Sequence, residues 1–170
     1  VFGQNGERLI EREKKYDTVE KFLSNLPPSG EIALYDYSLK NNFLLNEYRP
    51  GEEERSIDYS FRGSYQFYTY IKNEDLDYIF NFTDLNVNRD NDPVDIKVYS
   101  SDGLIRVEHI ADDSAASSER QARIKIAGLK AGVYRLSFIA DDDIITKNIT
   151  SRQSQFSLIN KVWFYDNNKK

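Results

Sequence analysis

The sequence predicts a mainly β fold: an antiparallel, jelly-roll-like β-sandwich preceded by a short helical N-terminal segment. Apolar and polar residues alternate in many short runs, which is the pattern of strands with one buried face. Turn-forming residues separate these runs at short intervals, as in all-β sandwiches. A single sheet covered by helices is the alternative fold, but one helical region offers too little helix to cover a sheet.

The helical segment is expected in residues 1–30, ahead of a β-sandwich domain at residues 31–170. Within residues 6–26, apolar side chains recur at spacings near three and four among charged ones: Leu9, Tyr16, Val19, Phe22, Leu23 and Leu26. Asp17 with Glu20 resembles a capping box, which favours a fresh helix start at Thr18. The Pro-Pro-Ser-Gly run that follows ends the helix, because proline cannot donate a helical hydrogen bond.

Beyond residue 30 the alternation has a period of two, and turn residues divide it into about ten short strands. The expected strands are 31–39, 43–48, 55–61, 64–72, 76–82, 94–100, 104–110, 121–127, 132–140, 144–150 and 154–165. Residues 112–120 form a low-complexity loop. The expected inward side chains are Tyr78, Phe80, Phe82, Val94, Ile96, Val98, Ile124, Ile126, Tyr134, Leu136 and Phe138. Their burial, at about 25 cal/mol per Å², would supply the main driving force for folding.

Composition narrows the classes of function. The net charge of −5 comes from well-mixed acidic and basic residues, which argues against a nucleic-acid partner. No apolar stretch reaches the 18 residues needed to span a membrane. Cysteine is absent, which removes disulfide support without excluding export. The chain begins with Val and contains no Met, so we interpret it as a mature or excised piece of a longer protein.

The loop between the strands 76–82 and 94–100 is a candidate metal site. Its oxygen-bearing side chains alternate along the chain and end in a further acid: Asp84, Asn86, Asn88, Asp90, Asp92 and Asp95. Calcium takes six to eight oxygen ligands, so these residues could bind it. Arg89, however, stands where the helix-loop-helix calcium motif has a glycine. The alternative is a solvated connection in which Asn and Asp make side-chain turns. The acidic run 141–143 is expected to be a solvated hairpin tip.

Two pairs of tyrosines are candidate ligand contacts. Tyr68 and Tyr70 share one face of the strand 64–72, and Tyr35 and Tyr37 make a similar pair on the strand 31–39. Exposed aromatic side chains with polar neighbours can stack on sugar rings or anchor a protein partner. The alternative is that the N-terminal helix packs over this face and buries it.

The sequence offers little equipment for catalysis. His109 is the single histidine, and with no cysteine it cannot complete a two-histidine or thiolate metal site. A Gly-x-Ser-x-Gly elbow and a Gly-rich phosphate loop are both absent. We therefore expect a protein that is not an enzyme. A carboxylate-dependent glycan hydrolase remains an alternative, because 28 acidic residues make some facing pair inevitable.

A stretch of less than half the chain, residues 65–139, carries a family resemblance. It includes the aromatic run from Tyr65 to Tyr68, the run DIKVYSSDG ending at Gly103, and AGLKAGVYRL ending at Leu136. This pattern resembles the pre-peptidase C-terminal type of β-sandwich module that is appended to secreted bacterial hydrolases. The resemblance implies an extracellular or cell-surface location and a non-catalytic role in secretion, adhesion or the binding of polysaccharides and proteins.

Together these observations predict a non-catalytic binding or structural module of a secreted or cell-surface protein. Its expected partner is a polysaccharide or a neighbouring protein domain. A hydrolase would instead show two facing carboxylates about 5–10 Å apart in a cleft. An architectural spacer without a ligand is the third possibility.

Overall fold

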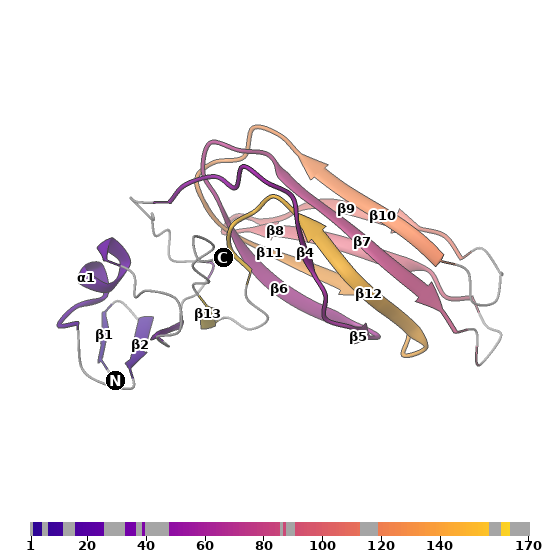
Figure 1. Ribbon diagram of the computed structural model, residues 1–170, viewed down its shortest axis with the longest axis horizontal. Helices are drawn as coiled ribbons and strands as arrows, with labels where there is room; N and C mark the ends of the chain where they lie inside the picture. Colours follow the sequence, from indigo (N-terminus) through magenta and orange to yellow (C-terminus); the bar gives the residue numbers. More distant parts are fainter. Residues whose placement is uncertain are drawn as a thin grey trace.

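The computed structural model describes residues 2–4, 7–11, 16–25, 33–36, 39, 48–85, 87, 91–112, 119–156 and 161–163. Two antiparallel sheets lie face to face (Figure 1). The first, here called the β7 sheet, has the strand order β10–β7–β12–β4, with β5 also paired to β12. The second, the β8 sheet, has the order β6–β11–β8–β9. This arrangement confirms the predicted class, a mainly β fold built as an antiparallel sandwich.

The strand bounds follow the predicted ranges closely in the centre of the chain. The β7 sheet contains β4 (Arg55–Ile57), β5 (Phe61–Arg62), β7 (Leu76–Asp84), β10 (Glu119–Ile126) and β12 (Ile144–Ser151). The β8 sheet contains β6 (Tyr65–Ile71), β8 (Val94–Ser100), β9 (Gly103–Ile110) and β11 (Gly132–Ile139). The predicted strand 55–61 is divided into β4 and β5, because β12 has a bulge between Thr146 and Asn148 that separates its two pairings.

The two ends of the predicted domain differ more from expectation. The predicted strand 154–165 is wrong over residues 154–156, and only β13 (Lys161–Trp163) is a strand in that range among the described residues. Of the predicted strand 43–48, only Tyr48 is described, and it is not in a strand.

The N-terminal segment contains strands as well as a helix, so the helical prediction over residues 6–26 is wrong in its first half. A small third sheet has the order β1–β2–β3–β13 and contains β1 (Phe2–Gln4), β2 (Glu7–Glu11), β3 (Ala33–Asp36) and β13. The sequence of β2, Glu-Arg-Leu-Ile-Glu, is compatible with a strand as well as with a helix. It forms a strand because it pairs with both β1 and β3.

The helix that does form, α1 (Val19–Ser24), begins at the predicted position. Thr18 is its N-cap residue: the side-chain oxygen accepts a hydrogen bond from the Lys21 backbone N–H at 3.2 Å. Asp17, predicted to be part of a capping box, instead forms an ion pair with the Lys21 ammonium at 2.8 Å. The start at Thr18 is therefore confirmed, although a hydroxyl and not the Asp17 carboxylate caps the helix.

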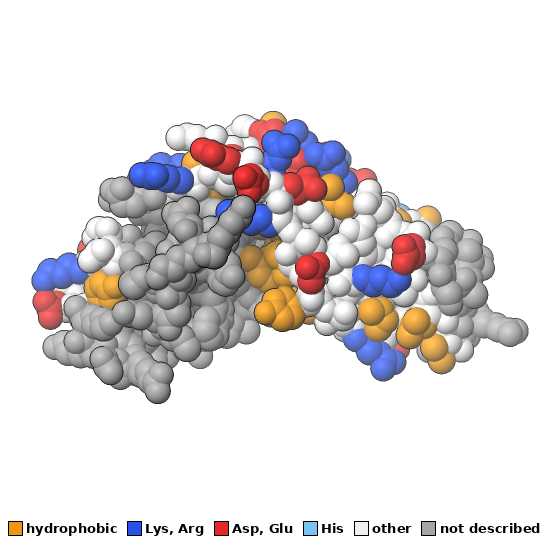
Figure 2. All heavy atoms as spheres, viewed as in Figure 1, with side chains coloured by type: hydrophobic (Ala, Val, Ile, Leu, Met, Phe, Trp, Pro, Cys, Tyr) orange, Lys and Arg blue, Asp and Glu red, His pale blue; other side chains and the backbone are white. Residues whose placement is uncertain are grey.

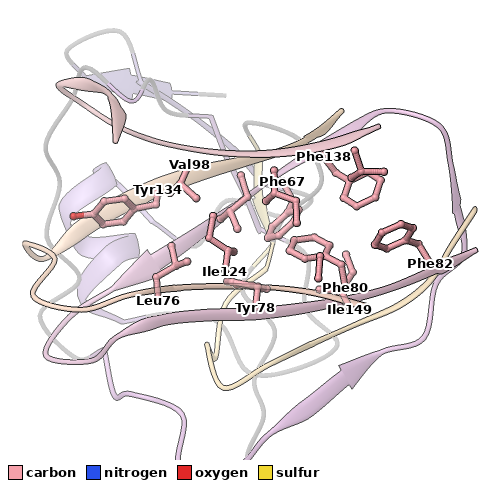
Figure 3. Packing of buried hydrophobic residues seen from close by; sticks show 14 of the residues in the cluster. Phe67, Leu76, Tyr78, Phe80, Phe82, Val98, Ile124, Tyr134, Phe138 and Ile149 are labelled. Atoms are coloured by element: carbon pink, nitrogen blue, oxygen red, sulfur yellow. The ribbon is translucent and has the colours of Figure 1, made fainter. Parts of the chain in front are cut away.

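The core lies between the β7 and β8 sheets and is dominated by aromatic rings (Figure 3). The Phe138 ring lies 5.5 Å from the Phe80 ring and 5.6 Å from the Phe82 ring, so side chains of the two sheets meet directly. The predicted inward residues that are buried in this cluster are Tyr78, Phe80, Phe82, Val94, Ile96, Val98, Ile124, Tyr134, Leu136 and Phe138. Ile126 packs against the cluster and is partly buried. The alternation in the sequence therefore identified the core correctly.

The outer face of the β7 sheet is polar, and its side chains pair with one another across the strands. Arg123 of β10 donates two hydrogen bonds to the Asp77 carboxylate of β7, at 2.6 and 2.8 Å. Asn81 of β7 accepts a hydrogen bond from Gln121 and donates one to Asn148. Cationic and anionic side chains are interspersed over the face that Figure 2 shows, without a block of one sign.

A buried glutamine ties the end of β12 to the start of β7. The Gln153 side chain donates to the Asp75 carbonyl oxygen at 2.7 Å and accepts from the Asp77 backbone N–H at 3.0 Å. The Ser151 hydroxyl donates to the same amide oxygen at 2.8 Å. Because Gln153 is buried, water cannot replace these bonds if the side chain is removed.

We expect Gln153→Ala to lower the free energy of unfolding by about 1–3 kcal/mol, the cost of leaving buried polar groups without partners. Urea denaturation followed by tryptophan or tyrosine fluorescence measures this loss. The control is Gln121→Ala, which removes a hydrogen bond at an exposed position and should cost roughly 0.5 kcal/mol or less. Equal losses for the two variants would contradict the structural role given to Gln153.

The Asp77–Arg123 pair predicts a pH-dependent contribution to stability. The hydrogen bonds from Arg123 hold the pKa of the Asp77 carboxyl below its usual range. A carboxyl with a lowered pKa in the folded state stabilises the fold above the unfolded pKa of about 3.9, and this contribution is lost as the pH falls through the folded pKa. Arg123→Gln should therefore destabilise the protein at pH 6 but not at pH 2, as measured by urea denaturation at both values. A deficit of equal size at both pH values would exclude the ion pair as its cause.

Candidate functional site

Three buried carboxylates meet at the end of the sandwich where β7 ends. Asp84 is the last residue of β7, Asp92 precedes β8, and Asp143 precedes β12. The three residues are 0%, 0% and 2% exposed, and each offers a carboxylate oxygen that lies within 4.8 Å of those of the other two. We call these residues the acidic group. Since β7 and β12 belong to one sheet and β8 to the other, the acidic group lies where the two sheets meet.

Backbone hydrogen bonds fix the position of Asp143. Its carbonyl oxygen accepts from the Leu85 N–H at 3.1 Å, and its carboxylate Oδ2 accepts from the Val87 N–H at 3.0 Å. The neighbouring Ile144 pairs with Asp84 in the register of β12 and β7. The turn before β12 and the loop after β7 are therefore joined by direct contacts. The other carboxylate oxygen of Asp143, Oδ1, is buried and has no hydrogen-bond partner among the described residues.

The acidic group overlaps only in part with the metal ligands predicted from the sequence. Asp84 and Asp92 are brought together, while Asn86, Asn88 and Asp90 lie outside the described residues. Asp95 lies apart on the strand β8, where its carboxylate is 2.7 Å from His109 Nδ1 and 3.6 Å from the Lys97 ammonium. The contact with His109 lowers the pKa of the Asp95 carboxyl.

Asp143 was expected to be solvated, and that expectation is wrong. Its neighbours Asp141 and Asp142 are exposed, as predicted for the acidic run 141–143. Asp143 differs because it directly precedes β12, whose pairing with β7 carries it inward beside Asp84. The one signal in the sequence for the burial of Asp143 is its position directly before a predicted strand. The pairing of β12 with β7, which causes the burial, joins residues far apart in the sequence and cannot be predicted from local periodicity.

The tyrosines predicted to bind a ligand do not form an exposed surface on β6. Tyr68 and Tyr70 are 9% and 1% exposed. The Tyr70 ring packs against the ring of Tyr48, at a centroid distance of 4.9 Å. Residue 48, which lies just before β4, therefore supplies part of the cover that the sequence assigned to the N-terminal helix. Tyr35 lies in β3, where it pairs with Leu9 and Val162, and Tyr37 lies outside the described residues.

The outer face of the β8 sheet carries an aromatic–cation contact that the sequence did not suggest. The guanidinium of Arg135, on β11, lies 4.1 Å from the centroid of the Tyr99 ring on β8. Within the described part of the chain the Arg135 side chain forms no ion pair or hydrogen bond, and its Nε atom is buried without a hydrogen-bond partner. The cross-strand register of β8 and β11, which places Arg135 opposite Tyr99, creates the contact.

Exposed apolar side chains lie beside this contact. Leu104 of β9 pairs with Tyr99, and Val107 pairs with Lys97. Both are among the exposed large hydrophobic residues, at 52% and 42% exposure. The outer face of the β8 sheet thus offers aromatic, aliphatic and cationic groups together. Polar side chains also bind one another further along this face, where Asp95 contacts His109 and Lys97.

A depression of about 370 Å³ adjoins this face at the end of the sandwich opposite the acidic group. It is lined by the turn after β8, the turn before β11, and Leu39, Ile105, Val133 and Tyr134. The Tyr134 hydroxyl donates to the Lys130 carbonyl oxygen at 2.7 Å, which fixes the turn that forms one wall. Burial raises the pKa of the Tyr134 hydroxyl above its usual value. Asp102 is the one carboxylate among the described lining residues.

Comparisons with known proteins identify no family. No model of a protein family matches the chain, and no curated protein matches it. Among solved structures, a family 35 carbohydrate binding module from an environmental isolate is similar, with 14% sequence identity and a TM-score of 0.38. The similarity covers 69% of this chain and 87% of that chain, and it is too low to carry an argument about function. The described helix is also too short to cross a membrane. The pre-peptidase C-terminal resemblance therefore stays a prediction from the sequence.

Proposed function

We propose that this chain is a non-catalytic binding module of a secreted or cell-surface protein, and that it recognises a polysaccharide through the outer face of the β8 sheet. The contact between Arg135 and Tyr99 is the observation that carries this proposal. It combines a ring that can stack on a sugar with a guanidinium that has no carboxylate partner in the described residues. A neighbouring protein domain is the other partner that such a surface could bind.

The difference between the arginines on the two outer faces supports the choice of surface. On the β7 sheet, Arg123 is already neutralised by Asp77, so a ligand would have to break existing ion pairs there. On the β8 sheet, Arg135 can donate hydrogen bonds to a ligand oxygen without such a loss. The exposed side chains of Leu104 and Val107 extend the same face with apolar area.

The chemistry of this surface favours a polysaccharide that carries acidic sugars. The Arg135 guanidinium covers one face of the Tyr99 ring, so a sugar ring would lie on the other face. The planar guanidinium of Arg135 matches the geometry of a carboxylate. Such polymers are met outside the cell, which agrees with the expected extracellular or cell-surface location.

The hydrolase alternative has less support in the described residues. A glycosidase needs two carboxyl groups about 5–10 Å apart on either side of the scissile bond. The oxygens of the acidic group lie within 4.8 Å, and its three residues are almost fully buried, so a sugar chain cannot reach them. The depression has Asp102 as its one described carboxylate. The geometry therefore supports binding better than hydrolysis.

Affinity electrophoresis in gels that contain polygalacturonate, xylan or mannan tests this proposal. We expect polygalacturonate to retard the protein most. Tyr99→Ala and Arg135→Gln should each weaken the binding about ten-fold, because a lost contact of about 1.4 kcal/mol changes an affinity by that factor. The matched control is Gln121→Ala on the outer face of the β7 sheet, which should bind like the wild type.

Three outcomes would contradict the proposal. Retardation by none of the polysaccharides would favour the spacer or a protein partner. Equal retardation of the wild type and both variants would place the binding surface elsewhere. Release of reducing ends from any of the polymers would favour the hydrolase. Melting temperatures of Tyr99→Ala and Arg135→Gln near that of the wild type would show that a loss of binding is not a loss of fold.

A further inference from the structure

The acidic group is a second feature of the structure, and it is independent of the proposed binding surface. We propose that Asp84, Asp92 and Asp143 bind one calcium ion, which links the β7 sheet to the β8 sheet at this end of the sandwich. This site retains Asp84 and Asp92 of the loop predicted from the sequence and adds Asp143 from a different turn.

The first argument is electrostatic. Three carboxylates within 4.8 Å of one another repel, and their burial removes the water that would screen this repulsion. Burial of an ionised carboxylate is unfavourable unless a cation or hydrogen bonds compensate for it. A divalent cation at the centre of the group compensates for all three charges at once.

The second argument is an oxygen atom whose hydrogen-bonding capacity is unused. Buried polar side-chain atoms nearly always have a hydrogen-bond partner, and an exception calls for an explanation. Oδ1 of Asp143 is such an exception, although Oδ2 of the same carboxylate is bound by the Val87 N–H at 3.0 Å. This hydrogen bond orients the carboxylate and leaves Oδ1 available. A cation bound by the acidic group gives Oδ1 the partner that the described residues do not supply.

The fold holds the three ligands in place from separate elements. Asp84 and Asp143 are positioned by the pairing of β7 with β12, and the Leu85 N–H donates to the Asp143 carbonyl oxygen. Asp92 enters from the chain that leads into β8, which belongs to the opposite sheet. A cation at this point therefore joins the β7–β12 pair to β8, which is paired with neither of these strands. This arrangement ties the binding of the ion to the folding of the sandwich.

The chemistry of the ligands selects calcium. The group offers oxygen atoms only, whereas zinc prefers histidine and cysteine ligands. Calcium accepts six to eight oxygens in flexible geometry, so backbone carbonyl oxygens or water can complete a shell that begins with three carboxylates. Magnesium gives up its bound water reluctantly and needs near-octahedral geometry. A buried site with three carboxylates therefore favours calcium over magnesium.

Thermal unfolding of chelator-treated protein, titrated with calcium or magnesium chloride at equal ionic strength, tests the site. Because the ion binds the folded state, calcium at about 100-fold its dissociation constant should raise the melting temperature by roughly 5–10 °C. Magnesium should raise it less. Isothermal titration calorimetry should give one calcium per chain. The absence of a calcium-specific shift, or a larger shift with magnesium, would overturn the proposal.

Variants locate the site. Asp143→Asn keeps the size of the side chain but removes one charge, so it should abolish most of the calcium-specific shift and raise the melting temperature of the calcium-free protein. Asp92→Asn should do the same from the opposite sheet, and it keeps the test decisive if Asp143→Asn does not fold. The matched control is Asp141→Asn, an exposed acid two residues from Asp143, which should keep the full shift. A full shift in both Asp143→Asn and Asp92→Asn would overturn the proposal, whatever polysaccharide binding shows.

Discussion

The fold depends on the packing of aromatic rings between the two sheets. Only 39% of the residues are hydrophobic, so the buried area must come from a few large side chains. The strand β7 supplies three of them, and it pairs with both β10 and β12. Phe138, from the opposite sheet, contacts two of these rings. Neighbouring residues of a strand point to opposite faces of the sheet. The register that turns these rings inward therefore also determines which side chains lie on the outer faces.

The alternation of residues was sufficient to predict this core, but not the partners of each strand. Phe80 and Leu136 could be assigned to the interior because strand periodicity is local information. The pairing of β12 with β7 is not local, and it alone explains why Asp143 is buried while Asp141 is exposed. For the same reason two members of the acidic group, Asp84 and Asp92, were among the residues predicted from the sequence, while the third, Asp143, was not. The N-terminal error has a related cause, since β2 is a strand only through its pairing with β1 and β3.

The tyrosines show a second limit of the sequence. Periodicity established that Tyr68 and Tyr70 share one face of β6, but it could not establish whether that face meets solvent. Tyr48, a residue remote in sequence, covers Tyr70. Tyr99 and Arg135 went unnoticed because each is ordinary within its own strand, and their contact arises only when β8 and β11 pair. Candidate sites that depend on cross-strand neighbours therefore need the sheet order before they can be recognised.

The two candidate sites lie at opposite ends of β8, and this separation limits how they can influence each other. Asp92 precedes the strand and Tyr99 lies near its other end, so at about 3.3 Å per residue they are roughly 20 Å apart. At this distance a charge at the acidic group interacts only weakly with the surface around Arg135, by about 0.2 kcal/mol per pair of unit charges at the dielectric constant of water. A cation would therefore affect ligand binding mainly by stabilising the folded sandwich that carries the binding surface. A cation-dependent fold and a cation-independent binding surface are therefore compatible in this molecule.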